Sequence, residues 1–165
     1  ETHGVDPSES GTAFAHAKYG LNVFCGNLFD ANFPDRHFDA ITLYHVLEHI
    51  PQPNPLLDEL RRILKPKTGR LVIEVPNAGS IQSRLQKEKW PYVHPTDHLY
   101  YFSAQTLSKL LRKHGFNRIQ MGVPKRVNPG KGLVNRVTFP IRKTVTAVLV
   151  RSHLATVIRV YAGYH

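Results

Sequence analysis

One stretch of the sequence decides the fold: Leu64-Lys65-Pro66-Lys67-Thr68-Gly69-Arg70-Leu71-Val72-Ile73-Glu74-Val75-Pro76-Asn77. It begins at the end of an amphipathic helix, in which apolar residues recur at helical spacing from Leu56 to Leu64. Residues 66–69 predict a tight turn, and residues 71–75 predict a buried strand that stops at Pro76. A helix that leads directly into a buried strand is typical of a sheet covered by helices.

The rest of the chain alternates strands and helices in the same way. Further strands are predicted at residues 3–5, 21–25, 38–44, 116–122 and 156–161. Helices are predicted to begin after Ser8, at Asn54-Pro55, at Ile81 and after Ser103. The first of these helices is predicted to end at Gly20. This alternation predicts an α/β fold with a mostly parallel sheet and helices on both faces.

The composition favours one core and an intracellular setting. A chain of 165 residues can bury a single core. No apolar run is long enough to cross a bilayer, and no signal peptide is visible. Cys25 is the only cysteine, so we expect a reducing, cytoplasmic environment. The chain opens on Glu1 rather than Met, which favours a fragment or a processed protein.

Charge is distributed very unevenly along the chain. The net charge is +10, yet residues 1–60 hold two basic and nine acidic residues, against twenty and three in residues 61–165. The basic half favours anionic lipid, nucleic acid or phosphorylated ligands. A solvated basic face or a surface for an acidic protein is an equally open interpretation. Residues 140–152 predict a basic amphipathic helix.

Residues 38–51 and 64–77 together resemble the middle of a class I S-adenosylmethionine-dependent methyltransferase. The resemblance covers residues 4–122 and implies a Rossmann-like three-layer sandwich with an antiparallel last strand. It also implies a single partial domain over residues 1–165, with residues 123–155 as a basic insertion and helix. The first strand of the family and its Gly-x-Gly-x-Gly loop are not in the sequence, so the implied fold is N-terminally truncated. Without this central strand, the strand that ends at Val5 and the strand at residues 38–44 are each expected to show an unpaired, apolar edge.

The resemblance implies S-adenosylmethionine as cofactor and places its binding residues at strand ends. Asp6 matches the carboxylate that accepts hydrogen bonds from the ribose hydroxyls, although an Asx turn ahead of a helix explains it too. Asn27 stands where relatives carry an aspartate that contacts adenine. Leu28 would pack on the adenine ring or in the core, and Tyr44 would line the cofactor pocket.

The catalytic candidates lie near the end of the fourth family strand and in a later aromatic loop. His45 and His98 are placed to orient the methyl acceptor or take a proton from it, and a purely structural role is an equally open interpretation for His45. Glu48 and His49 are assigned to the architecture. No metal site is predicted, because Glu48 and His49 do not share a helix face and no second cluster completes a ligand set.

Residues 90–103 resemble an acceptor-side loop of the family and are dense in aromatic residues and histidines. Trp90, Tyr92 and His94 are predicted to contact the substrate, where the rings would exclude water. A purely structural role, in which the loop is pinned to the core, is the alternative.

The implied function is methyl transfer from S-adenosylmethionine to a small-molecule or lipid-like acceptor. The alternative is a non-catalytic binding module that uses its basic C-terminal face. Contact with an anionic membrane, a homo-oligomer and segment exchange remain open as partner interactions, whereas nucleic acid is not expected.

Overall fold

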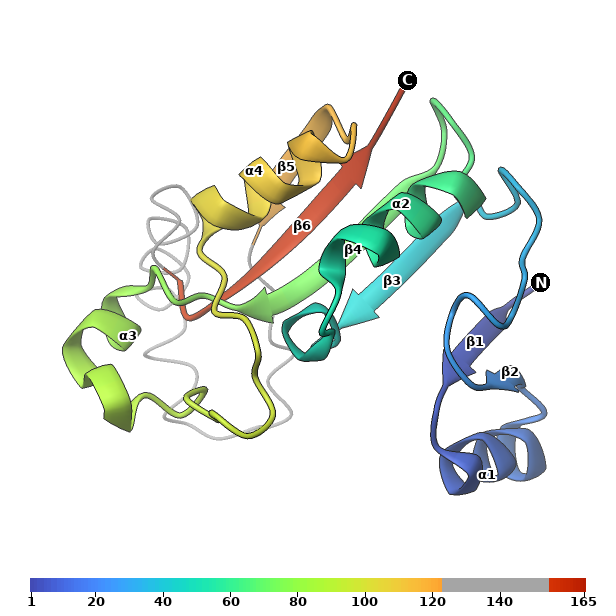
Figure 1. The fold of residues 1–165 in the computed structure, drawn as a ribbon, viewed down its shortest axis with the longest axis horizontal. Coiled ribbons are helices and arrows are strands. Elements are labelled where there is room, and N and C mark those ends of the chain that lie inside the picture. The colour runs from blue at the N-terminus through green and yellow to red at the C-terminus, as the bar shows by residue number, and fades with distance from the viewer. Residues whose placement is uncertain (123–154) are drawn as a thin grey trace, which may run out of the picture.

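The computed structural model describes residues 1–122 and 155–165, whose arrangement is drawn in Figure 1. The elements follow one another as β1 (His3–Asp6), α1 (Glu9–Tyr19), β2 (Asn22–Cys25), β3 (Ala40–Tyr44), η1 (Leu47–His49), α2 (Pro53–Ile63), β4 (Arg70–Pro76), α3 (Ile81–Gln86), η2 (Lys87–Lys89), α4 (Ala104–Lys113), β5 (Arg118–Gly122) and β6 (Val157–Gly163). The predicted alternation of strands and helices is confirmed for these residues.

Four strands form one sheet in the order β3-β4-β6-β5. β3 runs parallel to β4, with Leu43 opposite Ile73. β6 runs antiparallel to both of its neighbours, β4 and β5. The predicted antiparallel last strand is therefore confirmed, and it ends at Gly163, two residues beyond the predicted Tyr161.

The main core lies on one face of this sheet, under α2 and α4 (Figure 1). The cluster joins alternate residues of the two central strands to the buried stripes of the two helices: Leu71, Ile73, Val75, Ile158, Val160, Leu57, Leu60, Leu107 and Leu111. Burying one such side chain contributes about 1.5–3 kcal/mol. The two helices are therefore held against the sheet by the side chains that gave the helical spacing in the sequence.

The starts of these helices follow local signals in the sequence. α2 begins at Pro53, two residues before the predicted Pro55, and a proline at the first turn costs no backbone hydrogen bond. α4 is capped by Ser103, as predicted, because the Ser103 hydroxyl accepts from the Thr106 N–H at 3.1 Å.

A second, smaller sheet is formed by β1 and β2, which run parallel beside α1. Ser8 caps α1 through the N–H of Gly11, and Gly20 ends the helix with a φ of 62°. Both predicted ends are thus confirmed. The ring of His3 contacts Phe33 and Phe38 at centroid distances of 5.7 and 5.8 Å, so aromatic packing connects β1 to the loop that precedes β3.

β1 and β3 do not pair with each other in the described part of the chain, since they belong to different sheets. Figure 1 shows the small sheet beside the β3 end of the larger one, with β1 and β3 pointing the same way. The predicted unpaired edges of these two strands are therefore confirmed for the described residues. What pairs with them stays a prediction.

The predicted basic helix at residues 140–152 and most of the predicted insertion lie outside the described residues. No helix in the described part of the chain is long and apolar enough to cross a lipid bilayer.

Candidate functional site

His45 stands directly after β3 and contacts two carboxylates. Its backbone is left-handed, with a φ of 52°, and its N–H donates to the Glu74 carbonyl at 2.9 Å. The ring places Nδ1 3.2 Å from Oε1 of Glu48 and Nε2 3.5 Å from Oε1 of Glu74. A predicted catalytic residue is thus held from two sides at the carboxyl end of a parallel strand, where ligands bind in α/β sheets.

Glu74 joins this histidine to β6. Arg159 donates to Oε2 of Glu74 from Nε at 2.8 Å and from Nη2 at 2.6 Å, and this bond raises the pKa of the Arg159 guanidinium above its ordinary value. The same guanidinium lies 5.2 Å from the ring centroid of Tyr44, which is 48% exposed. The predicted cofactor residue Tyr44 therefore stands open to solvent beside a fixed cation.

The aromatic loop at residues 90–103 is fastened to the segment after β3. The carbonyl of Glu48 accepts from the N–H groups of Leu99 and Tyr100 at 2.9 and 3.2 Å. The hydroxyl of Tyr100 donates to the Pro51 carbonyl at 3.0 Å. These bonds bring a part of the chain some fifty residues distant in sequence next to η1. Pinning of the loop, given above as the alternative role, is observed.

The predicted substrate residues differ in exposure. Trp90 is buried, at 3% exposure, and its Nε1 finds no partner among the described residues. Tyr92 packs between Trp90 and His45, with ring centroids 5.2 Å from the first and 6.3 Å from the second, parallel to the imidazole. His94 is exposed, and its ring lies 5.2 Å from that of His98. The loop therefore presents Tyr92 and His94 and uses Trp90 as their buried support.

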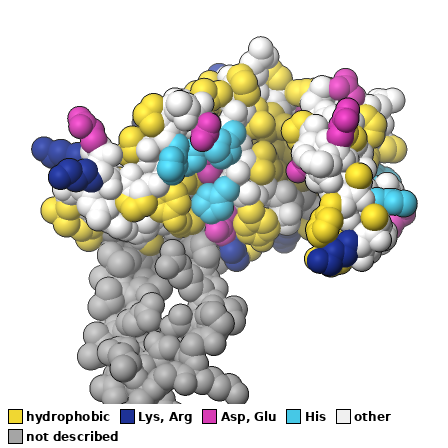
Figure 2. All heavy atoms as spheres, turned by 90° about the horizontal axis from the view of Figure 1, so that it is seen from below, with side chains coloured by type: hydrophobic (Ala, Val, Ile, Leu, Met, Phe, Trp, Pro, Cys, Tyr) yellow, Lys and Arg dark blue, Asp and Glu magenta, His cyan; other side chains and the backbone are white. Residues whose placement is uncertain are grey.

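His49 and His98 come together at the junction of η1 and the loop. Their ring centroids are 4.8 Å apart. Nδ1 of His49 lies 2.8 Å from the Asp97 carbonyl, and Nδ1 of His98 lies 2.9 Å from the Tyr92 carbonyl. Figure 2 shows histidine side chains gathered on one face beside acidic ones. The proximity of Glu48 and His49 to His98 depends on the fold of the loop, and the sequence alone did not predict it.

The predicted adenosine residues lie at the carboxyl ends of β1 and β2. Asp6 is exposed and accepts the Ser8 N–H through Oδ1 at 2.8 Å, which leaves Oδ2 without a partner among the described residues. The Gly26 N–H donates to the Asp6 carbonyl at 3.1 Å, and this joins the two strand ends. Gly26 has a φ of 151°, and a Cβ there would lie 2.7 Å from the Phe24 ring, so the turn requires glycine.

Asn27 and Leu28 have structural partners. Oδ1 of Asn27 accepts from the N–H groups of Phe29 and Asp30 at 2.9 and 3.0 Å, and Nδ2 donates to Asp30. Leu28 is half-buried against the main core. No hydrogen bond or ring contact joins this group to the histidine cluster in the described residues, so the structure places the predicted residues at two separate strand ends.

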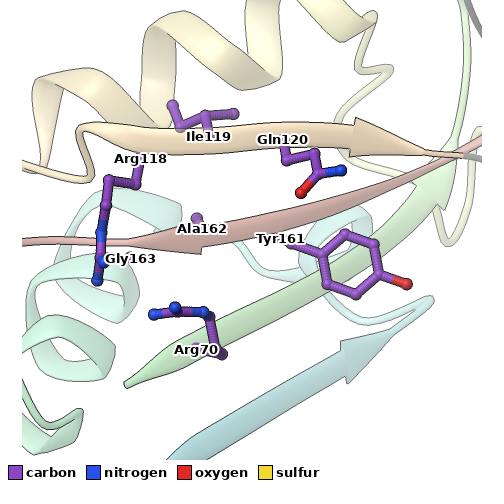
Figure 3. Close-up of a pocket in the computed structure, with 7 residues that line it drawn as sticks. All are labelled: Arg70, Arg118, Ile119, Gln120, Tyr161, Ala162 and Gly163. Atoms are coloured by element: carbon purple, nitrogen blue, oxygen red, sulfur yellow. The ribbon is translucent and has the colours of Figure 1, made fainter. Parts of the chain in front are cut away.

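A pocket elsewhere on the molecule is lined by Arg70 of β4 and Arg118 of β5 (Figure 3). Arg70 donates from Nη1 to the Thr68 carbonyl at 3.0 Å, and Arg118 donates to the Lys67 carbonyl. These guanidinium groups thus hold the turn that precedes β4. Because Arg70 begins β4, the pocket lies at the end of that strand opposite to His45, away from the expected ligand edge.

Comparison with known proteins places this geometry in context. The methyltransferase domain family matches residues 1–121. An uncharacterized protein of Methanocaldococcus jannaschii, MJ1123, is 27% identical over 117 residues, which are 71% of this chain and 56% of that protein. The 2-phytyl-1,4-naphtoquinone methyltransferase of Synechococcus elongatus is 38% identical over 50 residues, 30% of this chain and 22% of that enzyme. The chain thus spans about half the length, or less, of these two relatives.

A solved structure shows the same fold. A SAM-dependent methyltransferase of Thermotoga maritima, described as a possible histamine N-methyltransferase, superposes with a TM-score of 0.68 at 21% identity. The superposition covers 99% of this chain and 73% of that one. The predicted Rossmann-like α/β class is confirmed by this match.

Proposed function

We propose that this chain, which belongs to the methyltransferase domain family of S-adenosylmethionine-dependent enzymes, forms the adenosine-binding and acceptor-facing sides of a methyl transfer site. The observation that supports this most is that the candidate residues lie in two groups at the carboxyl ends of strands. One group stands at the carboxyl ends of β1 and β2, and the other stands at the carboxyl end of β3. Figure 1 shows β1 and β3 pointing the same way, and β2 runs parallel to β1.

The residues at the first strand end fit the adenosine part of the cofactor. Asp6 offers Oδ2 as an acceptor for ribose hydroxyls, while its Oδ1 fixes the side chain through the Ser8 N–H. Asn27 contributes by shaping the turn after β2 rather than by a free amide, because both of its polar atoms already have partners. Phe29, at 52% exposure, is the apolar side chain of this turn that is open to a ring.

The residues at the second strand end fit the methyl acceptor. His45 is held by Glu48 and Glu74, and Tyr92 stacks on its ring. Tyr44 and His94 are exposed next to these groups. We propose that this surface binds a small-molecule or lipid-like acceptor. The phytyl-naphthoquinone methyltransferase among the relatives supports including the lipid-like class.

Catalysis in this proposal consists mainly of alignment. The bound cofactor supplies an activated methyl group on its sulfonium. Asp6 binds the nucleoside, and the aromatic loop orients the acceptor and excludes water. His45 and His98 hold the acceptor in place for this transfer.

A binding titration with S-adenosylhomocysteine tests the nucleoside site. The 165 residues contain no Gly-x-Gly-x-Gly loop, so we expect weak binding, which chemical-shift titration by NMR detects. Asp6→Asn keeps an acceptor for the Ser8 N–H but loses the carboxylate. We therefore expect it to weaken binding by about 1–3 kcal/mol without changing the thermal unfolding midpoint.

The matched control is Glu9→Gln, which makes the same change of charge in the first turn of α1. Shift changes confined to residues 4–8 and 24–29 and lost in Asp6→Asn would support the site. Equal affinity in Asp6→Asn and the unsubstituted chain would remove Asp6 from it.

A further inference from the structure

Glu48, His49 and His98 form a group of potential metal ligands, and two of them, Glu48 and His98, also belong to the acceptor side of the proposed methyl transfer site. One potential ligand atom of each residue lies within 4.8 Å of those of the other two. Glu48 and His49 lie on η1, and His98 comes from the aromatic loop. The group therefore depends on the hydrogen bonds that hold the loop against η1, at the Glu48 carbonyl and at His49.

Glu48 has an unmet requirement for a partner. It is 1% exposed, and its Oε2 has no hydrogen-bond partner among the described residues. Burying a carboxylate oxygen without a partner costs several times what a typical hydrogen bond contributes, and native proteins rarely do so. Oε1 is held by Nδ1 of His45 at 3.2 Å, so the side chain is fixed while Oε2 stays available.

In both histidines the hydrogen bond made by Nδ1 determines the tautomer and leaves Nε2 as the nitrogen that can bind a metal ion. A carbonyl oxygen only accepts, so Nδ1 of His49 donates to Asp97 and Nδ1 of His98 donates to Tyr92. In a neutral ring the lone pair then lies on Nε2. Histidines that bind metals show this pattern, with the second ring nitrogen donating to a backbone carbonyl or a carboxylate.

We infer that Glu48, His49 and His98 bind a divalent cation of the zinc type. Two imidazoles and one carboxylate are a ligand set that zinc accepts, with a fourth position left for water or substrate. Zinc bonds of about 2.1 Å hold the ligand atoms of a tetrahedral site roughly 3.4 Å apart. The potential ligand atoms of the three residues lie within 4.8 Å of one another, so the side chains must move closer together to bind the ion. The exposed His49 side chain is the member that is free to make this movement.

The ion would face the same surface as the proposed acceptor. His49 and His98 adjoin Tyr92 and His94 in the loop, and Glu48 contacts His45. A cation here offers an anchoring point for an oxygen-bearing acceptor. Its binding depends on side chains of this chain alone and needs neither cofactor nor acceptor.

Zinc titration of the purified chain, followed by competition with a chromophoric chelator, tests the inference. We expect one equivalent to bind with a dissociation constant of about 1 µM or tighter. Glu48→Gln, His49→Gln and His98→Gln should each weaken binding about tenfold or more. The matched control is His94→Gln, which removes a neighbouring imidazole outside the ligand group and should leave the affinity unchanged.

Two further readouts secure the result. Glu48 is buried, so circular dichroism is used to check that the Glu48→Gln variant folds. If it does not fold, the His49→Gln variant still tests the inference, because His49 is exposed. NMR of the ring nitrogens should show zinc shifting Nε2 of His49 and His98. The inference would be overturned if the chain did not bind zinc, or if the His49 and His98 variants bound zinc as tightly as the unsubstituted chain. Zinc-induced shifts at Nδ1 instead of Nε2 would overturn it too.

Discussion

The backbone of His45 is constrained in a way that its side chain explains. A non-glycine residue with a φ of 52° carries a cost of about 1–2 kcal/mol, although histidine is among the residues that tolerate it best. The cost is offset locally, because the Glu74 carbonyl accepts from the His45 N–H and two carboxylates flank the ring. Strain of this kind gathers at functional sites.

Comparing His45→Gly with His45→Ala separates the backbone cost from the side-chain contacts. Both variants lose the contacts with Glu48 and Glu74, and only glycine relieves the left-handed strain. We expect the glycine variant to have the higher free energy of unfolding, by about 1 kcal/mol, in urea denaturation. At an ordinary strand position the order is reversed, so alanine as the more stable variant would contradict the account.

At this scale the sequence predicted part of the site. His45, Tyr92, His94 and His98 were all candidates from the sequence, and the structure brings Tyr92 next to His45 and His94 next to His98. The use of the Asn27 amide in its own turn was not, because such side-chain bonds compete with ligand contacts in ways that residue type alone does not reveal. The Glu48, His49 and His98 group escaped detection because one of its members is brought in by the fold of the loop.

Among the elements, α4 has the clearest local signal. The Ser103 hydroxyl accepts from the Thr106 N–H at 3.1 Å, and the Thr106 hydroxyl accepts from the Ser103 N–H at 2.8 Å. This reciprocal cap fixes the point where the aromatic loop becomes a helix. Behind it, Leu107 and Leu111 are fully buried in the core. The cap therefore connects the candidate acceptor loop to the buried core of the larger sheet.

Removing this cap should lower stability by a defined amount. We expect Ser103→Ala to reduce the free energy of unfolding by about 1 kcal/mol, because the Thr106 N–H loses its partner. Chemical denaturation followed by circular dichroism measures the change. The control is Thr106→Ser, which keeps the reciprocal hydroxyl and should cost much less; equal losses in the two variants would show that packing, not capping, decides the effect.

The helices were largely predictable from the sequence, because capping residues mark where they begin and end. Ser8 and Gly20 bound α1, and Ser103 caps α4, at the predicted residues. The observed start of α2 differs from the predicted one because two nearby prolines, Pro53 and Pro55, can both begin a helix. The helix begins at Pro53. β6 runs on to Gly163 because its pairing with β4 and β5, invisible in the local sequence, sets its length.

For the whole molecule, the division into two sheets is the dominant feature. β1 pairs only with β2, and β3 pairs only with β4, among the described residues. The sequence predicted the strands and their unpaired edges, because the resemblance implies a central strand that the 165 residues do not contain. The arrangement across the gap depends on contacts such as those of the His3 ring, which no periodicity reveals.

The unpaired edge of β3 has a consequence for behaviour in solution. An exposed strand edge presents free N–H and carbonyl groups that another chain can pair with. We therefore propose that the chain associates with itself or exchanges a segment, and we expect its weight-average mass to rise with concentration in sedimentation equilibrium. Thr42, exposed in the middle of β3, is the position from which this association can be weakened.

Thr42→Lys introduces a charge of the kind that natural edge strands use to block pairing. We expect it to weaken self-association by roughly tenfold or more, which corresponds to about 1.4 kcal/mol. Thr68→Lys makes the same chemical change in the exposed turn before β4 and should leave association unaltered. A chain that stays monomeric at every concentration, or equal effects of the two lysines, would show that β3 is not the associating edge.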